Sequence, residues 1–176
     1  FEGNTVLFVN VDGYSSNKVG GSRAAHWMLL ETAFSSLTTQ QGNGLWLTHN
    51  EHPLINQTGR ATLKNARESG IFVFRANRAS DILQALAFSQ QHNLNAVISG
   101  GQEAWIVREE LVASGTPVVI NALDNLPGSF DGLGARLDNA ALLHEADITL
   151  LFTSGETHNA RKLRQVAGNA VANGLP

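Results

Sequence analysis

The sequence predicts an α/β fold in which a parallel sheet is covered by helices. Short apolar runs typical of strands alternate with longer segments whose apolar residues recur at helical spacing. At least five such strand–helix units are visible, and no repeat of fixed period or low-complexity segment interrupts them. Parallel strands need a crossover connection, usually a helix, so this alternation favours parallel pairing. With 176 residues the chain can bury a sizeable core, and residues 1–176 are predicted to form one domain.

The strands are predicted from apolar runs rich in β-branched residues and bounded by glycine or polar residues. Six segments fit this description: Thr5–Val11, Leu45–Thr48, Ile71–Phe74, Ala96–Ile98, Pro117–Ile120 and Asp147–Phe152. Polar loops are expected at Asp12–Gly21 and Asn121–Gly134.

The helices are predicted from apolar residues spaced three or four apart and from residues that favour helix ends. Ser22 is placed to cap the first helix, and Gly70 follows the end of the second. The predicted helices are Arg23–Leu37, Gln57–Glu68, Ser80–His92, Glu103–Ala113, Leu137–Glu145 and His158–Asn173.

Composition restricts the possible partners. A net charge of −3 gives no electrostatic reason to expect a nucleic acid or an anionic membrane. No apolar run approaches the ~20 residues needed to cross a bilayer, so we expect a soluble protein of the cytoplasm or periplasm. The absence of cysteine excludes disulfides and thiolate chemistry but does not fix the compartment. Because the chain starts at Phe1 and stops just after a helix, we expect a piece of a longer protein.

In parallel α/β folds the functional residues lie in the loops that follow the strands. The candidate binding residues in those loops are Arg75, Asn77, Ser99, Gly100, Gly101, Asn121 and Ser154. The fork of an arginine suits a carboxylate ligand, and an internal ion pair of Arg75 with Glu156 is the alternative. The Gly-Gly pair suits close approach of a ligand to a helix start, and the alternative is a tight turn.

The loop after the last predicted strand carries the candidates for catalysis. Glu156 supplies a carboxylate, and His158 supplies an imidazole that can act as a base near neutral pH. For His158 a hydrogen bond at the helix end without a catalytic role is the alternative. Asp81 is interpreted as a charge in the first turn of its helix.

The other five histidines do not predict a metal site. No pair of histidines has the H-x-H or H-E-x-x-H spacing that directs two imidazoles at one metal ion. His49 and His52 flank a proline-containing loop and are expected on the surface. His26, His92 and His144 fall within or at the ends of predicted helices, where solvent-facing or capping roles are expected.

Four segments resemble the amidohydrolase superfamily, and within it the imidazolonepropionase-like metal-dependent hydrolases. They are Phe72–Ile82, Val97–Trp105, Leu137–Ala146 and His158–Pro176. The resemblance implies a partial (β/α)8 TIM-like barrel of about five to six βα units, forming the second half of the family fold. It further implies a family that binds one or two divalent metals, usually zinc, and hydrolyses amide or other C–N bonds with a metal-bound hydroxide. The family ligands are an H-x-H pair on the first strand, histidines on the fifth and sixth, and an aspartate on the eighth.

This chain departs from that ligand set wherever it overlaps it. The fifth-strand histidine falls at Arg75, the sixth-strand histidine at Ser99, and the eighth-strand aspartate at or beside Ser154, with Glu156 two residues on. The first-strand pair would lie upstream of this chain. We therefore expect no metal ligands and no cofactor in this chain, although zinc is possible in the intact family fold.

Three functional hypotheses follow. The first is a domain of a hydrolase that acts on the C–N bonds of a small-molecule substrate, with the isolated chain inactive. The second is a non-catalytic module that binds a small anion through Arg75. The third is a structural module, because a half-barrel exposes two sheet edges and an apolar inner face. It predicts a homo-oligomer, or pairing with the missing half-barrel.

Overall fold

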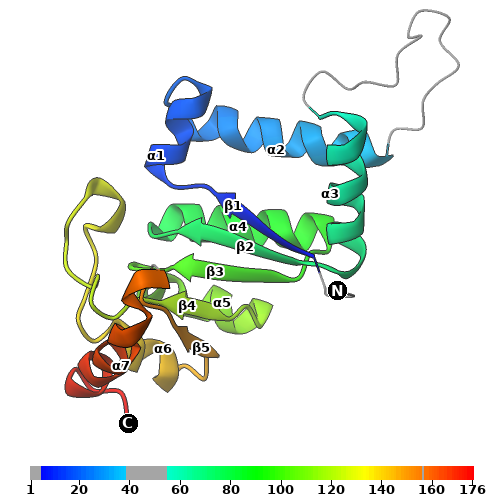
Figure 1. Ribbon diagram of the computed structural model, residues 1–176. Coiled ribbons are helices and arrows are strands. Elements are labelled where there is room, and N and C mark those ends of the chain that lie inside the picture. Colours follow the sequence, from blue (N-terminus) through cyan, green and yellow to red (C-terminus); the bar gives the residue numbers. More distant parts are fainter. Residues whose placement is uncertain (1–4, 39–54, 156) are drawn as a thin grey trace, which may run out of the picture.

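A single parallel sheet organises the computed structural model, which describes residues 5–38, 55–155 and 157–176. The strand order along the sheet is β1-β2-β3-β4-β5, so every strand pairs with the next one in the sequence (Figure 1). The strands are β1 (Val6–Asn10), β2 (Ile71–Ala76), β3 (Ala96–Gly100), β4 (Val118–Ile120) and β5 (Leu150–Phe152). The predicted parallel α/β fold is confirmed.

Helices connect consecutive strands. The α-helices are α1 (Gly13–Ser16), α2 (Arg23–Thr38), α3 (Gln57–Ser69), α4 (Ala79–His92), α5 (Arg108–Ser114), α6 (Asn139–Glu145) and α7 (Leu163–Ala172). The 3-10 helices are η1 (Asn17–Val19), η2 (Ala104–Val107), η3 (Phe130–Gly132) and η4 (Thr157–Lys162). Among the described helices, none is both long and apolar enough to cross a membrane.

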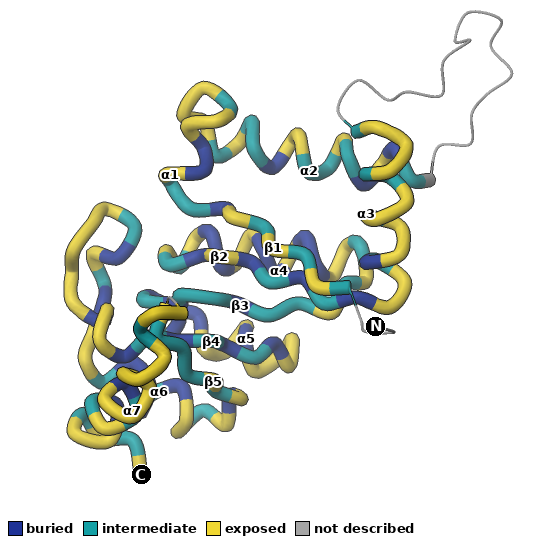
Figure 2. The backbone as a smooth tube through the Cα atoms, in the orientation of Figure 1, coloured by how far each residue is buried: buried dark blue, intermediate teal, exposed yellow. Residues whose placement is uncertain are grey.

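An aromatic core joins β2 to the helices that cover it. Phe72 and Phe74 alternate with the outward positions of β2 and are fully buried on its helix-covered face. Phe88 of α4 lies between Trp27 and Phe34 of α2, with ring centroids 5.5 Å and 5.0 Å away. Each such pair adds about 0.5–1.5 kcal/mol beyond the burial of apolar surface. Figure 2 accordingly shows buried positions in β2 and α4.

The opposite face of the sheet, called the open face below, has no such cover within residues 5–38, 55–155 and 157–176. Register places Phe8, Val73 and Val97 in one row across β1–β3, and Val119 beside Leu151 across β4 and β5. Phe8 is 76% exposed, and Leu151 is also exposed. The edges of the sheet, β1 and β5, each pair with only one strand within the described chain. The open face is therefore apolar surface in contact with solvent, and such surface normally marks an interaction site.

Several element boundaries differ from the predicted ones. The region predicted as the polar loop Asp12–Gly21 contains α1, because the Asp12 side chain caps this helix by accepting from the Ser15 amide at 2.8 Å. The last strand is shorter than Asp147–Phe152, because Asp147 adopts a left-handed backbone (φ 62°) before β5 begins. The predicted strand Leu45–Thr48 lies outside the described residues.

The predicted helix Glu103–Ala113 is divided into η2 and α5. Glu103 itself precedes η2, with its side chain engaged by backbone amides from two other segments. The helix predicted from His158 starts as η4 and becomes regular only at Leu163. Ser22 acts as predicted, accepting a hydrogen bond from the Ala25 amide at the start of α2.

The open face predicts self-association of the 176-residue chain. Substituting Phe8→Asp places a charge at the β1 side of this face, and it should shift sedimentation velocity profiles from a dimer or larger species toward the monomer. Met28→Asp is the matched control, because Met28 is similarly exposed but lies on α2, on the helix-covered side. A monomeric wild-type chain, or equal dissociation in both variants, would contradict the prediction.

Candidate functional site

Every pairing is parallel, so the carboxyl ends of all five strands lie at the same end of the sheet. We call this end the carboxyl edge, to distinguish it from the edge strands β1 and β5. Functional residues of parallel α/β proteins gather at this edge. Asn10, Arg75 and Ser99 occupy neighbouring register positions on β1, β2 and β3. The structure thus brings together two predicted site residues, Arg75 and Ser99, and places Asn10 beside Arg75. Arg75 and Ser99 lie within β2 and β3 and not in the loops where the sequence predicts them, because both strands extend further than their apolar runs. We call these three the carboxyl-edge row.

Arg75 is the cation of the carboxyl-edge row. Its side chain is 65% exposed on the open face, and its Nε lies 3.9 Å from Oδ2 of Asp12. In a charge-assisted hydrogen bond these atoms would lie about 2.7–2.9 Å apart. Most N–H groups of the guanidinium are therefore available to a ligand. The predicted partner Glu156 lies outside the described residues. Asp12 is thus the carboxylate that faces Arg75 in the described part of the chain.

Gly100 and Gly101 form a tight turn at the end of β3. Both have positive φ values, 103° and 60°. The Gly101 amide donates to the Ala76 carbonyl at 2.8 Å, and a Cβ atom on Gly100 would collide with the Asn77 side chain. These contacts explain both glycines by the backbone conformation of a tight turn, which is the alternative given for the Gly-Gly pair. A ligand role for Asn77, Gly100 and Gly101 stays a prediction.

The remaining predicted site residues lie at the ends of β4 and β5. The side-chain amide of Asn121 donates to the Asp124 carboxylate at 2.7 Å, so Asn121 belongs to a turn after β4. Ser154 follows β5 in a loop where the Gly155 amide donates to the Thr153 hydroxyl at 3.1 Å. His158 lies in η4 and is exposed, while Glu156 is outside the described residues. Catalytic roles for Glu156 and His158 stay predictions.

An ionic cluster lies at the same edge, and no local sequence pattern predicts it. The Arg23 guanidinium on α2 donates to Asp81 at 3.1 Å and also to Asp131. Asp131 accepts a second hydrogen bond, 2.6 Å long, from the Gly13 amide. The predicted position of Asp81 in the first turn of its helix is confirmed, and its partner Arg23 is new. We call Arg23, Asp81 and Asp131 the ionic cluster.

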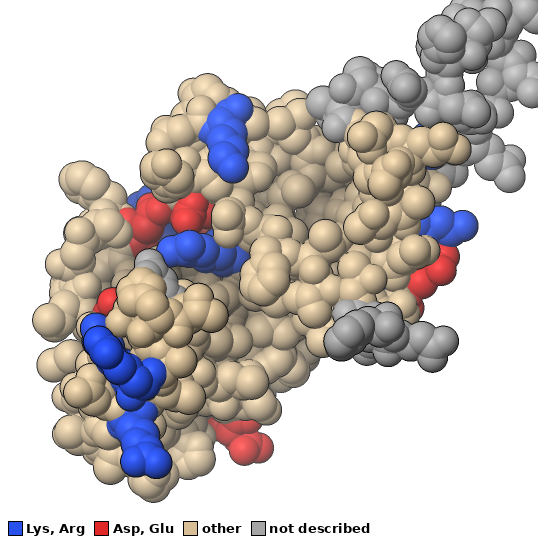
Figure 3. Space-filling model, viewed as in Figure 1, with Lys and Arg blue, Asp and Glu red and all other residues tan. Residues whose placement is uncertain are grey.

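Burial and charge shift the pKa values of two groups near this cluster. Burial raises the pKa of the Asp81 carboxyl, and the neighbouring Arg23 opposes that rise. Burial lowers the pKa of His26, while Asp12 raises it and Lys18 lowers it further. Figure 3 shows acidic and basic side chains gathered close together near the carboxyl ends of the strands. Arg23 therefore stabilises a carboxylate that burial alone would favour as the neutral acid.

Glu103 is a further buried polar residue at this edge, 8% exposed. One carboxylate oxygen accepts from the Ala79 amide and the other from the Gly134 amide, each at 2.9 Å. This side chain therefore joins the start of α4 to the loop between β4 and α6. Nothing in its local sequence distinguishes it from an exposed helical glutamate.

The side chains at the carboxyl edge do not fit a metal site. No group of three or more histidine, aspartate or glutamate residues in the described chain could hold an ion. Zinc prefers imidazole and carboxylate ligands, yet the carboxyl-edge row offers an amide, a guanidinium and a hydroxyl. Three carboxylates of this edge face arginines instead, since Asp12 faces Arg75 while Asp81 and Asp131 bind Arg23. The carboxylate of Glu103 accepts from two backbone amides.

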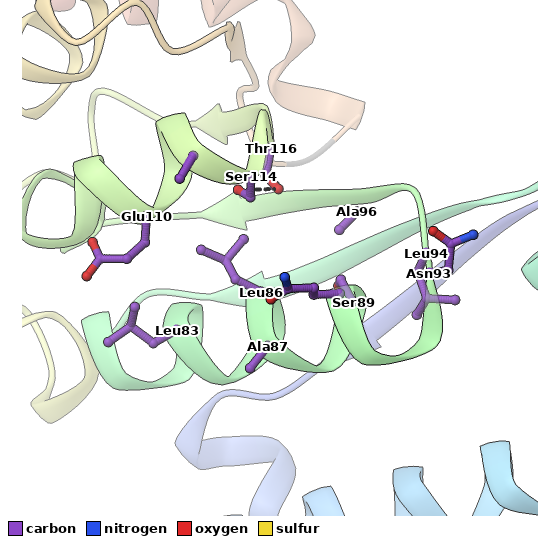
Figure 4. A pocket seen from close by; sticks show the side chains of 12 residues that line it. Leu83, Leu86, Ala87, Ser89, Asn93, Leu94, Ala96, Glu110, Ser114 and Thr116 are labelled. Atoms are coloured by element: carbon purple, nitrogen blue, oxygen red, sulfur yellow. Dashed lines mark hydrogen bonds between the residues drawn. The ribbon is translucent and has the colours of Figure 1, made fainter.

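A groove between α4 and α5 lies away from this edge. It has a volume of about 560 Å³ and is lined by residues that include Leu83, Leu86 and Ala87. Figure 4 shows these side chains facing α5, with Ser114 and Thr116 hydrogen-bonded to each other. The groove residues Ala96 and Thr116 lie at the amino ends of β3 and β4, so the groove does not reach the carboxyl-edge row.

Comparison with known proteins identifies the architecture. No protein-family model and no curated protein matches the sequence. The structure is similar to that of an amidohydrolase from Thermotoga maritima MSB8, with a TM-score of 0.77 and 15% identity. The similarity covers 98% of this chain and 47% of the other, so this chain spans about half the length of that protein. The described chain therefore has an amidohydrolase-like α/β fold and corresponds to a partial (β/α)8 barrel.

Proposed function

We propose that this chain is an amidohydrolase-related domain that binds a small carboxylate ligand through Arg75 at the carboxyl edge. The observation that carries this proposal is an exposed guanidinium in register between Asn10 and Ser99, at the edge where such folds bind their ligands. The family resemblance assigns metal ligands to the positions of Arg75 and Ser99. In this chain those positions suit an anion instead.

The chemistry of the carboxyl-edge row supports a carboxylate in particular. A guanidinium presents parallel N–H donors that match the two oxygens of a carboxylate. Asn10 and Ser99 lie on the two sides of Arg75. The side-chain amide of Asn10 and the hydroxyl of Ser99 can each donate one more hydrogen bond. Hydrogen bonds to a charged group contribute about 1.5–3 kcal/mol each, enough to hold a small ligand weakly.

The apolar part of the open face supports an organic ligand over an inorganic anion. Val73 and Val97 lie two residues before Arg75 and Ser99 on the same face of the sheet. Ligand sites typically combine an apolar wall with a few polar groups that fix orientation. A carboxylate held by Arg75 would extend its hydrocarbon part along this row.

A second candidate is hydrolysis of amide or cyclic amide C–N bonds by the longer protein. It is favoured by the similarity to an amidohydrolase, of which this chain spans about half. In that case Arg75 would hold a carboxylate of the substrate, and Glu156 and His158 would be candidates for proton transfer. Metal ligands would have to come from outside this chain. The imidazolonepropionase-like branch, with its cyclic amide substrates, belongs to this candidate.

The binding proposal predicts that Arg75→Ala abolishes carboxylate binding. In thermal unfolding with acetate, glutarate and N-acetylglycine, a carboxylate at ~100 times its dissociation constant should stabilise the wild type by roughly 2.7 kcal/mol. Arg75→Lys should retain only weak binding, because an ammonium lacks the planar fork. Arg108→Ala removes an exposed arginine of α5 as the matched control. Equal stabilisation of wild type and Arg75→Ala, or of neither by any carboxylate, would refute the proposal.

The hydrolase candidate predicts a difference between the isolated chain and the longer protein. After dialysis against zinc, elemental analysis should find no stoichiometric zinc in the 176-residue chain, because its donor set does not fit the ion. The longer protein should hydrolyse amide, dipeptide or cyclic amide substrates. His158→Asn and Glu156→Gln should each lower its kcat by about 10²–10⁴-fold.

The control for this series is His144→Asn, which changes an exposed histidine at the end of α6. Stoichiometric zinc in the isolated chain would contradict the assignment of its donor set. Absence of turnover across all three substrate classes would exclude the hydrolase candidate and leave the binding proposal intact.

A further inference from the structure

The loop between β4 and α6 crosses the carboxyl edge of the sheet. We call residues 121–134 of this loop the strap. In Figure 1 it leaves the end of β4, extends beside the carboxyl ends of the strands toward α1, and returns to α6. Near its end it contains η3, and the side chain of Asp131 in this turn reaches the segment that follows β1.

Hydrogen bonds hold both ends of the strap. Near its start, the Gln102 side chain donates to the Asp124 carbonyl at 2.6 Å. At its end, the Gly134 amide donates to Glu103 at 2.9 Å, and the Gly134 carbonyl accepts from the Trp105 indole at 2.8 Å. Glu103 is itself tied to α4. The two ends therefore behave as fixed points, and any movement is confined to the residues between them.

The ionic cluster holds the part of the strap around Asp131, which we call its tip. Asp131 accepts from Arg23 and from the Gly13 amide, and Arg23 is held in turn by Asp81, whose side chain is 4% exposed. A Cβ atom on Gly13 would lie 2.8 Å from Asp131 Oδ2 and 2.9 Å from an Arg23 nitrogen. A side chain at position 13 would therefore push the Asp131 carboxylate and the Arg23 guanidinium away from their present positions.

Apolar contacts contribute little to this attachment. Leu126, Phe130 and Leu133 of the strap are all more than half exposed. A segment with little apolar burial opens at a low free-energy cost compared with global unfolding. The ionic cluster thus supplies the hydrogen bonds that keep the tip of the strap beside α1 and α2.

The same cluster reaches the counter-ion of Arg75. Gly13, whose amide binds Asp131, directly follows Asp12, and Asp12 lies 3.9 Å from Arg75. The Asp12 carboxylate also caps α1 through the Ser15 amide. A carboxylate ligand on Arg75 brings a second negative charge close to Asp12 and repels it, and movement of Asp12 changes the position of the Gly13 amide.

We propose that the strap is a gate whose closed state is held by Asp131 and whose opening is coupled to occupation of Arg75 by a carboxylate. This inference rests on the proposed binding function. The closed strap holds Asp12 beside Arg75, and a bound carboxylate repels Asp12 and so weakens the contact of Gly13 with Asp131. Coupling of this kind is reciprocal, so release of the strap raises the affinity of Arg75 for carboxylates by the same factor.

Amide hydrogen exchange of residues 121–134 in the full 176-residue chain tests the closed state. Asp131→Asn keeps the shape of the side chain but leaves one acceptor oxygen for two donors, so exchange in the strap should accelerate about tenfold or more. Gly13→Ala should act similarly without changing any charge. Asp138→Asn, which breaks the exposed ion pair with Arg136, is the control. Unchanged exchange in both cluster variants would overturn the proposed gate.

Titration with sodium acetate, against sodium chloride at equal ionic strength, tests the coupling. Acetate should accelerate strap exchange in the wild type and have no effect in Arg75→Ala, and Asp131→Asn should bind acetate more tightly than the wild type. If acetate binds through Arg75 but strap exchange and the affinity of Asp131→Asn are unchanged, the gate is refuted and the binding function stands. If neither acetate nor the other carboxylates bind, the binding function itself fails and the coupling fails with it.

Discussion

Parallel pairing of five consecutive strands is the constraint on which the rest of this structure depends. It brings every strand's carboxyl end to one edge of the sheet, and its register sets Asn10, Arg75 and Ser99 side by side. It also separates the two faces of each strand, so that Phe72 and Phe74 enter the aromatic core while Val73 and Arg75 remain on the open face. The candidate ligand site and the uncovered apolar surface are therefore two results of the same pairing.

Much of this arrangement could be predicted from local patterns. Alternation of apolar runs with helical spacing predicts a parallel sheet, and the position of Arg75 directly after Phe74 predicts a cation at a strand end. Resemblance to amidohydrolases predicts the partial barrel. These predictions succeed because strand and helix formation depend on residues close together in the sequence, and because parallel strands align their ends.

The interactions that hold the carboxyl edge together could not be predicted in this way. Asp131 binds Gly13 and Arg23 across 118 and 108 residues of sequence, and no local pattern records such a contact. Glu103 looks like an ordinary helical residue but is buried and binds two backbone amides. Ion pairs between loops depend on how far each loop extends, which apolar periodicity does not encode.

The consecutive strand order has an evolutionary consequence. Among the described strands, each one pairs only with the strands before and after it in the sequence, and helices lie between consecutive strands. A gene duplication or fusion that adds a βα unit beside β1 or β5 would leave every existing pairing unchanged. The edges that expose this sheet to solvent are thus also the places where the architecture can grow by whole units, without redesign of the part already built.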